Sequence, residues 1–173
     1  MENQSIECEL KIEDDYRKSN YNKKLRYFYP LNQETNFKIN KFFRTITKNK
    51  RHSSKTINVK GRDFKIENFY EGIVRFNFNE LCDKNLGSED YIMIANNCDF
   101  IFIQNLPNFD ENNPNQQQRF ITLIDIIYEK SIPLMITSQS KIDLLSSSNN
   151  LKQSFKRTIS RLYELTSIKL NYL

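Results

Sequence analysis

Glycine is scarce in this sequence of 173 residues, which contains only Gly61, Gly72 and Gly87. A loop that cradles nucleotide phosphates needs several closely spaced glycines, so that backbone N–H groups can wrap around the phosphates, followed by a lysine and a serine or threonine. None of the three glycines precedes such a pair. The residues themselves therefore offer no phosphate-binding loop for ATP.

Cysteine and histidine are also rare. Cys8, Cys82 and Cys98 form no CxxC pair, which argues against a structural zinc site or a disulfide framework and favours a reducing compartment. The one histidine, His52, has no cysteine or acid near it in the sequence that could orient it or share a metal, so we interpret it as a surface residue. No Ser-His-Asp, Cys-His or paired-carboxylate arrangement stands out either. The sequence predicts no metal site and no self-sufficient catalytic site.

Long apolar runs are absent too. None approaches the roughly 20 residues that a membrane-spanning helix needs. The first residues, Met1-Glu2-Asn3-Gln4, do not resemble a signal peptide. We therefore expect a soluble intracellular protein without a transmembrane segment. The length suits one domain, and 38% hydrophobic residues suffice for a core.

Charge is distributed unevenly along the chain. Residues 17–65 contain fifteen Lys and Arg against only Glu34 and Asp63, a local charge of +13, so the remainder carries −8 of the net +5. A basic front and an acidic back are typical of a chain with a partner. Candidate partners are nucleic acid, an anionic membrane surface, an acidic protein or another part of a larger assembly. The alternative is a lysine-rich face that meets only solvent.

The stretch from Cys98 to Ser140 predicts the centre of the fold. Residues 100–103 form an apolar run closed by turn residues, and residues 132–136 form a second apolar run. Between them a helix carries apolar residues at the i, i+3, i+4, i+7 spacing of one buried face, namely Phe120, Leu123, Ile124 and Ile127. Strand, helix and strand in this order predict a βαβ unit with two parallel strands.

Polar residues at the ends of these two strands form a candidate site. Parallel strands end at the same edge of a sheet, where ligands bind in open α/β folds, and that edge would bring together Gln104, Asn105 and Ser138. In a P-loop ATPase the first strand would end in an acid that binds Mg²⁺. The amides Gln104 and Asn105 cannot hold the metal as a carboxylate would.

Periodic patterns predict the remaining elements around this unit. Strands are expected at 5–13, 25–30, 56–60, 64–66 and 73–78, helices at 35–47, 79–82, from 88 onwards and at 151–165, and polar loops at 48–55, 110–117 and 144–150. The predicted fold class is α/β, with the central βαβ unit on a mostly parallel sheet and an N-terminal part that mixes strands with a helix.

The helix expected at 35–47 has an aromatic face and a basic face. The aromatic and aliphatic set Phe37, Phe42, Phe43 and Ile46 is predicted to face inward, and the basic set Lys38, Lys41, Arg44 and Lys48 to face outward. Such a mixture can bind nucleic acid by stacking on bases and neutralising phosphates. Phenylalanines at helical spacing equally suit a core, so both interpretations stay open.

The helix expected at 151–165 carries Arg157 and Arg161 one turn apart. Like charges at this spacing repel unless an anion or an acid lies between them. Paired arginines on a rigid helix can grip a phosphate or a carboxylate of a partner. Alternatively they form a salt bridge with Glu164 or with another element of the same chain.

Several ordered segments resemble the C-terminal half of the ZapE-type, or AFG-like, family of AAA ATPases. The segments are FNFNELCDKNLGSEDYIMIA from Phe76, FIFIQNLPNF from Phe100, QRFITLIDIIYEKSIPLMITS from Gln118 and FKRTISRLYELTS from Phe155. Upstream, DYR from Asp15, YFYPL from Tyr27 and VKGR from Val59 follow in family order. The resemblance covers nearly the whole chain but only the back half of a full member.

The resemblance implies a partial P-loop NTPase-like (AAA) fold, in which residues 1–75 are a basic N-terminal part and residues 76–173 an α/β unit with a C-terminal helix. Full members hydrolyse ATP with Mg²⁺ and act at the bacterial division ring on the cytoplasmic side of the membrane, and mitochondrial relatives are linked to protein quality control. Their Walker A and Walker B segments lie upstream of where this chain starts. The resemblance thus implies a portion that is inactive alone and needs an upstream-encoded half, located in the cytoplasm, at the inner membrane or in the mitochondrial matrix.

The chain also departs from the family at several positions. An acid is usual where Gln104 or Asn105 stands, a double arginine where Gln118-Arg119 stands, and a methionine where Leu165 stands. The RTxSRLxE pattern is kept, so the resemblance suggests Arg157, Ser160, Arg161 and Glu164, together with Arg119, as contacts to nucleotide or to a neighbouring subunit. Two other functions compete with an ATPase portion. One is a non-catalytic module that binds a division-ring protein or another acidic partner through the basic residues of 17–65, and the other is nucleic-acid binding by the same face.

Overall fold

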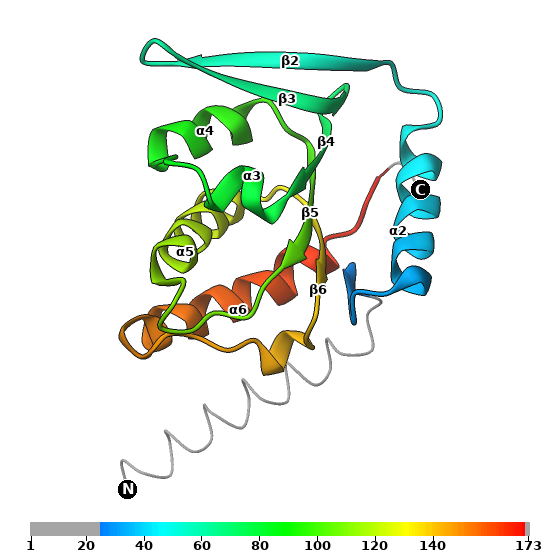
Figure 1. The fold of residues 1–173 in the computed structure, drawn as a ribbon. Coiled ribbons are helices and arrows are strands. Elements are labelled where there is room, and N and C mark those ends of the chain that lie inside the picture. The colour runs from blue at the N-terminus through cyan, green and yellow to red at the C-terminus, as the bar shows by residue number, and fades with distance from the viewer. Residues whose placement is uncertain (1–24, 172–173) are drawn as a thin grey trace, which may run out of the picture.

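The computed structural model describes residues 25–171, and a six-stranded sheet runs through the middle of them (Figure 1). The strands are β1 (Tyr27–Phe28), β2 (His52–Val59), β3 (Arg62–Tyr70), β4 (Ile73–Asn77), β5 (Phe100–Leu106) and β6 (Leu134–Ser138), in the spatial order β1-β6-β5-β4-β3-β2. The first four of that order are parallel, whereas β3 and β2 are antiparallel additions. The predicted α/β class with a mostly parallel sheet is confirmed. The strand expected at 5–13 lies outside the described residues.

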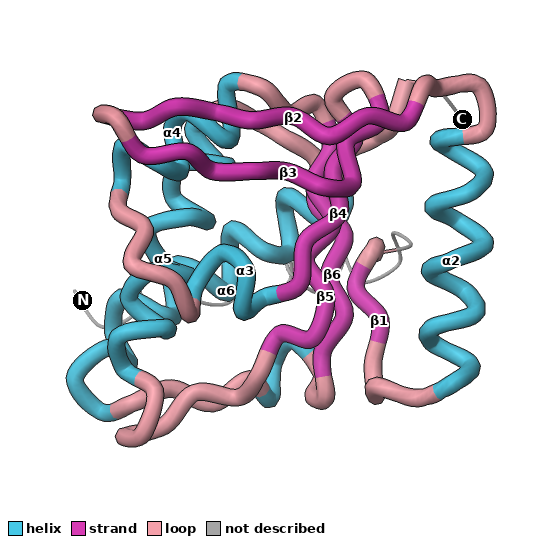
Figure 2. The backbone as a smooth tube through the Cα atoms, turned by 45° about the horizontal axis from the view of Figure 1, so that its top comes forward, coloured by secondary structure: helices cyan, strands magenta, loops and turns pink. Residues whose placement is uncertain are grey.

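Helices cover both faces of this sheet. They are α2 (Gln33–Thr47), α3 (Phe78–Cys82), α4 (Ser88–Asn96), α5 (Pro114–Glu129) and α6 (Lys152–Ser167), with 3-10 turns at Ile142–Leu144 and Asn149–Leu151. Helix α2 stands alone on one face, and α3 to α6 lie on the other (Figures 1 and 2). Strand β5 is buried on both faces because Phe100 and Phe102 pack in the cluster around α2, while Ile101 and Ile103 pack in the larger cluster around α3 to α6.

The predicted βαβ unit is confirmed as β5, α5 and β6. The two strands are parallel neighbours, with Ile101 paired with Leu134 and Ile103 paired with Ile136. Helix α5 starts at Pro114, so the second half of the loop expected at 110–117 is helical. Proline suits the first turn of a helix because the N–H that it lacks would have no partner within the helix.

Two further expectations about the N-terminal part are wrong. The loop expected at 48–55 ends at Arg51, because β2 begins at His52 and forms a long hairpin with β3. Helix α2 does not bury Phe37, which is 69% exposed; Ile39 is buried instead. Ile39, Phe43 and Ile46 share the i, i+4, i+7 stripe that faces the sheet, and Phe37 lies on the opposite stripe. Within residues 25–171, no helix has both the length and the apolar character needed to cross a membrane.

Candidate functional site

The strands β1, β6, β5 and β4 end at one edge of the sheet, where the polar strand-end residues meet. The N–H of Asn105 donates to Thr137 Oγ1 at 2.9 Å, and Leu106 is paired with Ser138. Ser138 is fully buried, and its hydroxyl donates to the carbonyl oxygen of Leu106 at 3.0 Å. Ser138 therefore links the ends of β5 and β6. Ser138 is buried, whereas Asn105 is exposed.

Gln104 takes part in a different contact, on the side of the sheet that α2 covers. Its Oε1 accepts from Nε of Arg75 at 2.7 Å, and Nη2 of Arg75 donates to Oδ1 of Asn40 on α2 at 2.8 Å. The guanidinium lies 5.2 Å from the ring centre of Phe43, and burial lowers the pKa of Arg75. Gln104 thus serves as a neutral acceptor for a half-buried cation, and this network joins β4, β5 and α2.

The loop from β1 to α2 lies at the same edge of the sheet. The sequence patterns did not predict its position beside the other strand ends. A parallel strand followed by a loop and a helix is the arrangement that holds phosphates in P-loop proteins. Here the loop, residues 29–32, contains no glycine. The side chain of Asn32 caps the N–H of Thr35 at 2.9 Å, and Glu34 places a negative charge in the first turn. The helix start is therefore filled by the chain's own acceptor, and its acid disfavours a phosphate.

The arginine pair of α6 meets an acid from the neighbouring helix α5. Nη2 of Arg157 lies 3.0 Å from Oδ2 of Asp125, and Arg161 pairs with the other oxygen of the same carboxylate. The guanidinium of Arg161 also stacks 4.5 Å from the ring centre of Tyr128, whose hydroxyl donates to Glu164 at 2.9 Å. Asp125 is the acid that relieves the repulsion of the pair. Sequence patterns gave no sign of which helix would supply it.

The other two candidates, Ser160 of the RTxSRLxE pattern and Arg119 of α5, lie apart from this carboxylate. The hydroxyl of Ser160 donates to the carbonyl oxygen of Lys156 in its own helix at 3.3 Å. Arg119 donates from Nη1 to the carbonyl oxygen of Cys82 at 3.1 Å, at the end of α3. The structure thus brings together Arg157, Arg161 and Glu164, while Arg119 joins α5 to α3. Their role toward nucleotide or a subunit stays a prediction.

We expect Asp125→Ala to lower the free energy of unfolding by about 1 to 2 kcal/mol, since two partly exposed arginines lose the acid between them and repel each other. The measurement is urea unfolding at low and high salt. Glu129→Ala, on the same helix and exposed, is the matched control and should change little. The difference between the variants should shrink in about 1 M salt, where charges are screened beyond about 3 Å. Equal losses in both variants would contradict this assignment.

The basic residues of α2 form a surface with few internal partners. Lys38 pairs with Glu34 at 2.7 Å. The other three, Lys41, Arg44 and Lys48, make no ion pair with any residue in the described range 25–171. Together with Phe37 they border a shallow depression of about 600 Å³. We call Phe37, Lys41, Arg44 and Lys48 the α2 stripe.

Cysteine and metal chemistry find no support in the described part of the chain. Cys82 and Cys98 are free and buried. Burial raises the pKa of Cys98 to about 12 and also raises the pKa of Cys82, so neither thiol is a nucleophile at neutral pH. Among residues 25–171 no three His, Cys, Asp or Glu side chains gather closely enough to hold a metal ion.

Comparison with known proteins places this geometry in context. The AFG1-like ATPase family matches residues 6–172. Cell division protein ZapE of Escherichia coli K12 and that of strain O157:H7 are each 24% identical over 153 residues, which is 88% of this chain and 41% of each relative. Lactation elevated protein 1 homolog B of Danio rerio is 32% identical over 91 residues, 53% of this chain and 18% of that protein. The chain thus spans less than half the length of these relatives, and no solved structure matches it.

Proposed function

The chain belongs to the AFG1-like ATPase family, and from this premise we propose that it is the C-terminal portion of a ZapE-type ATPase that serves cell division. The family match over almost the whole chain carries the proposal. The mostly parallel sheet with helices on both faces supports it, since P-loop ATPases are built in this way. The cytoplasm, the inner-membrane surface and the mitochondrial matrix are the locations that the family resemblance suggests.

In this proposal the chain alone hydrolyses no ATP. The strand-loop-helix of β1 and α2 at the carboxyl edge lacks glycine in its loop, and Asn32 caps the helix start. Neither Gln104 nor Asn105 can bind Mg²⁺ as a carboxylate would. ATP and Mg²⁺ would be bound by an ATPase half that carries the Walker segments. Arg157, 58% exposed, would reach nucleotide or a neighbouring subunit, while Arg161, 21% exposed, holds the cluster on Asp125.

The test is phosphate release by the purified chain with ATP and Mg²⁺. We expect no release above the no-protein background, because the residues that must surround the phosphates are missing. Arg157→Ala and Arg161→Ala serve as the matched variants, and circular dichroism checks that each protein is folded. Release above background that disappears in either variant would overturn the proposal, because these residues would then act in a complete site.

A second candidate function is a non-catalytic interaction module. The cations of the α2 stripe, which form no ion pair with any residue of 25–171, favour it, together with the exposed ring of Phe37. Its partner would be a division-ring protein or another acidic protein. Nucleic acid would be attracted by the same charges, and its affinity would then fall steeply as salt increases. If changing Lys38, Lys41 and Arg44 to Glu abolishes binding, this basic face is the binding surface, whether the partner is an acidic protein or nucleic acid.

A further inference from the structure

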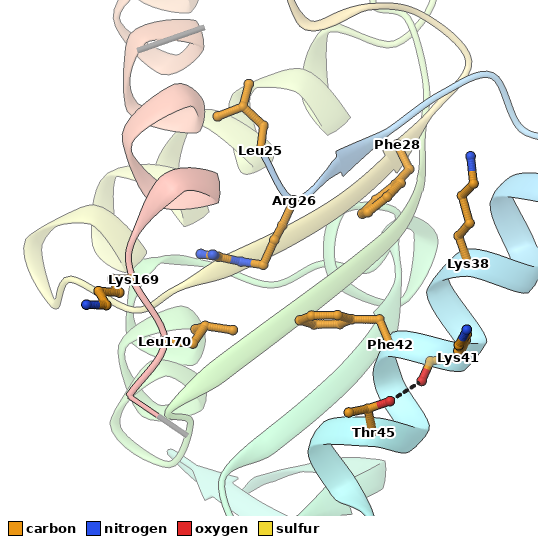
Figure 3. Close-up of a pocket in the computed structure, with 9 residues that line it drawn as sticks. All are labelled: Leu25, Arg26, Phe28, Lys38, Lys41, Phe42, Thr45, Lys169 and Leu170. Atoms are coloured by element: carbon orange, nitrogen blue, oxygen red, sulfur yellow. Dashed lines mark hydrogen bonds between the residues drawn. The ribbon is translucent and has the colours of Figure 1, made fainter. Parts of the chain in front are cut away.

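A groove of about 800 Å³ lies where β1, α2 and the segment after α6 meet (Figure 3). Apolar side chains form its floor, with Phe28 from β1, Phe42 from α2 and Leu170 from the segment that follows α6. Lysines border it, with Lys38 and Lys41 along α2 and Lys169 beside Leu170. We call this site the edge groove. Its lining includes neither the strand-end candidates Gln104, Asn105 and Ser138 nor the arginine cluster.

The charge of the edge groove is not balanced within the described chain. Lys38 is paired with Glu34, but neither Lys41 nor Lys169 forms an ion pair with any residue of 25–171. The residues that border the groove include no acid. The acid Glu34 lies one helical turn from Lys38. An occupant that brings both an apolar group and a negative charge would therefore suit the floor and the border at once.

The backbone beside the edge groove is a sheet edge. Strand β1 is the outermost strand of the sheet and pairs only with β6, so its other side meets no strand within residues 25–171. Exposed strand edges accept an extended peptide as an additional strand, through main-chain hydrogen bonds. Phe28 and Arg26 turn toward the groove (Figure 3). Every second side chain of an added strand would then lie on the same face of the sheet as Phe28.

We propose that the edge groove binds an extended acidic peptide segment of a partner protein. The segment adds to β1, packs a large apolar side chain against Phe28 at the border of the groove, and carries an acid two positions away, on the same face, toward the lysines of the groove. The concave shape favours a peptide over a flat membrane surface. The apolar floor and the free strand edge favour a peptide over nucleic acid. This inference does not depend on the ATPase proposal.

The test is a binding measurement by fluorescence anisotropy with two labelled peptides of identical composition. Fluorescein-TETFTETFT-NH2 places its acids and rings on one face of a strand, whereas fluorescein-TTEFETTFT-NH2 places its acids opposite to its rings. We expect the first to bind about tenfold more tightly than the second. N-methylation of alternate amides in the first peptide should abolish binding, because the strand pairing would be lost.

Charge reversal in the protein supplies the second arm. The double variant Lys41→Glu/Lys169→Glu should weaken the first peptide about tenfold. The double variant Lys152→Glu/Lys156→Glu makes the same charge change at exposed positions of α6, on the other face of the sheet, and should leave affinity unchanged. Equal binding of the two peptides, or equal effects of the two double variants, would overturn the proposal. Displacement of the peptide by oligo-dT, with the same dependence on Lys41 and Lys169, would also overturn it and assign the groove to nucleic acid.

Discussion

Replacing Arg26 with methionine is expected to lower the free energy of unfolding by about 3 kcal/mol, because three carbonyl oxygens lose a charged donor. Its Nε donates to the carbonyl oxygen of Leu134 at 3.1 Å. Its two terminal nitrogens donate to the carbonyl oxygens of Ile168 at 2.7 Å and of Leu165 at 3.1 Å. The latter two lie at the end of α6, where the helix dipole favours a cation. Arg26 thereby fastens the edge strand to both its neighbouring strand and the last helix.

Methionine keeps the apolar stem of Arg26, so the variant removes the charged head group, with its donated hydrogen bonds and its contact at 5.5 Å with the ring centre of Phe100. Urea unfolding followed by circular dichroism gives the difference in stability. Arg44→Met, an exposed position on α2, is the control and should change stability by less than about 0.5 kcal/mol. The Arg26 variant should also lose peptide binding, because Leu170 would no longer be held beside Phe42. Equal stability of the two variants would show that the carbonyl contacts of Arg26 contribute nothing.

A second large effect is expected at Gly72, where Gly72→Ala should cost about 2 kcal/mol against about 1 kcal/mol for Gly61→Ala. Both glycines end two-residue hairpin turns in which both residues have positive φ, 51° and 78° in one turn and 48° and 93° in the other. An alanine at either position would have to adopt a positive φ, which is unfavourable for a residue with a Cβ. Only at Gly72 would the new Cβ lie 2.2 Å from Oδ2 of Asp99, whereas nothing lies within 4 Å at Gly61.

The same unfolding measurement separates the two contributions. In the background of Asp99→Ala, the cost of Gly72→Ala should fall toward that of Gly61→Ala, because the contact has been removed while the backbone angle has not. The stability lost in Gly61→Ala measures the effect of the positive φ alone, because no atom lies within 4 Å of the new Cβ there. An equal cost at the two glycines, or no gain in the double variant, would contradict the role of the Asp99 contact.

Local patterns predicted the centre of the fold well. The βαβ unit of β5, α5 and β6 followed from two apolar runs and one helical period, because alternation and the 3.6-residue repeat are properties of neighbouring residues. Element ends were less accurate, as at Pro114 and His52, since caps and strand pairing decide them. The inward position of Phe37 was wrong because α2 has one sheet-facing stripe, and its five phenylalanine and isoleucine residues fitted two possible stripes.

The candidate sites depended on contacts that the sequence does not specify. Gln104 and Asn105 could be placed at a strand end, but the partner of Gln104 is Arg75, twenty-nine positions away. The acid between Arg157 and Arg161 is Asp125, on another helix. Such pairs form only when packing of the helices on the sheet brings distant segments together, and no local periodicity encodes that choice.

By itself the sequence determined the α/β class, the central parallel pair of strands, the family resemblance and the lack of a glycine-rich phosphate loop, since each of these lies in residues close together along the chain. Only the tertiary structure decided that Arg75 donates to Gln104, that Asp125 holds the arginine pair, and that Phe28, Phe42 and Leu170 enclose a groove. The physical reason is that these groups are far apart in the chain, and burial of two apolar clusters on opposite faces of one sheet is what places them side by side.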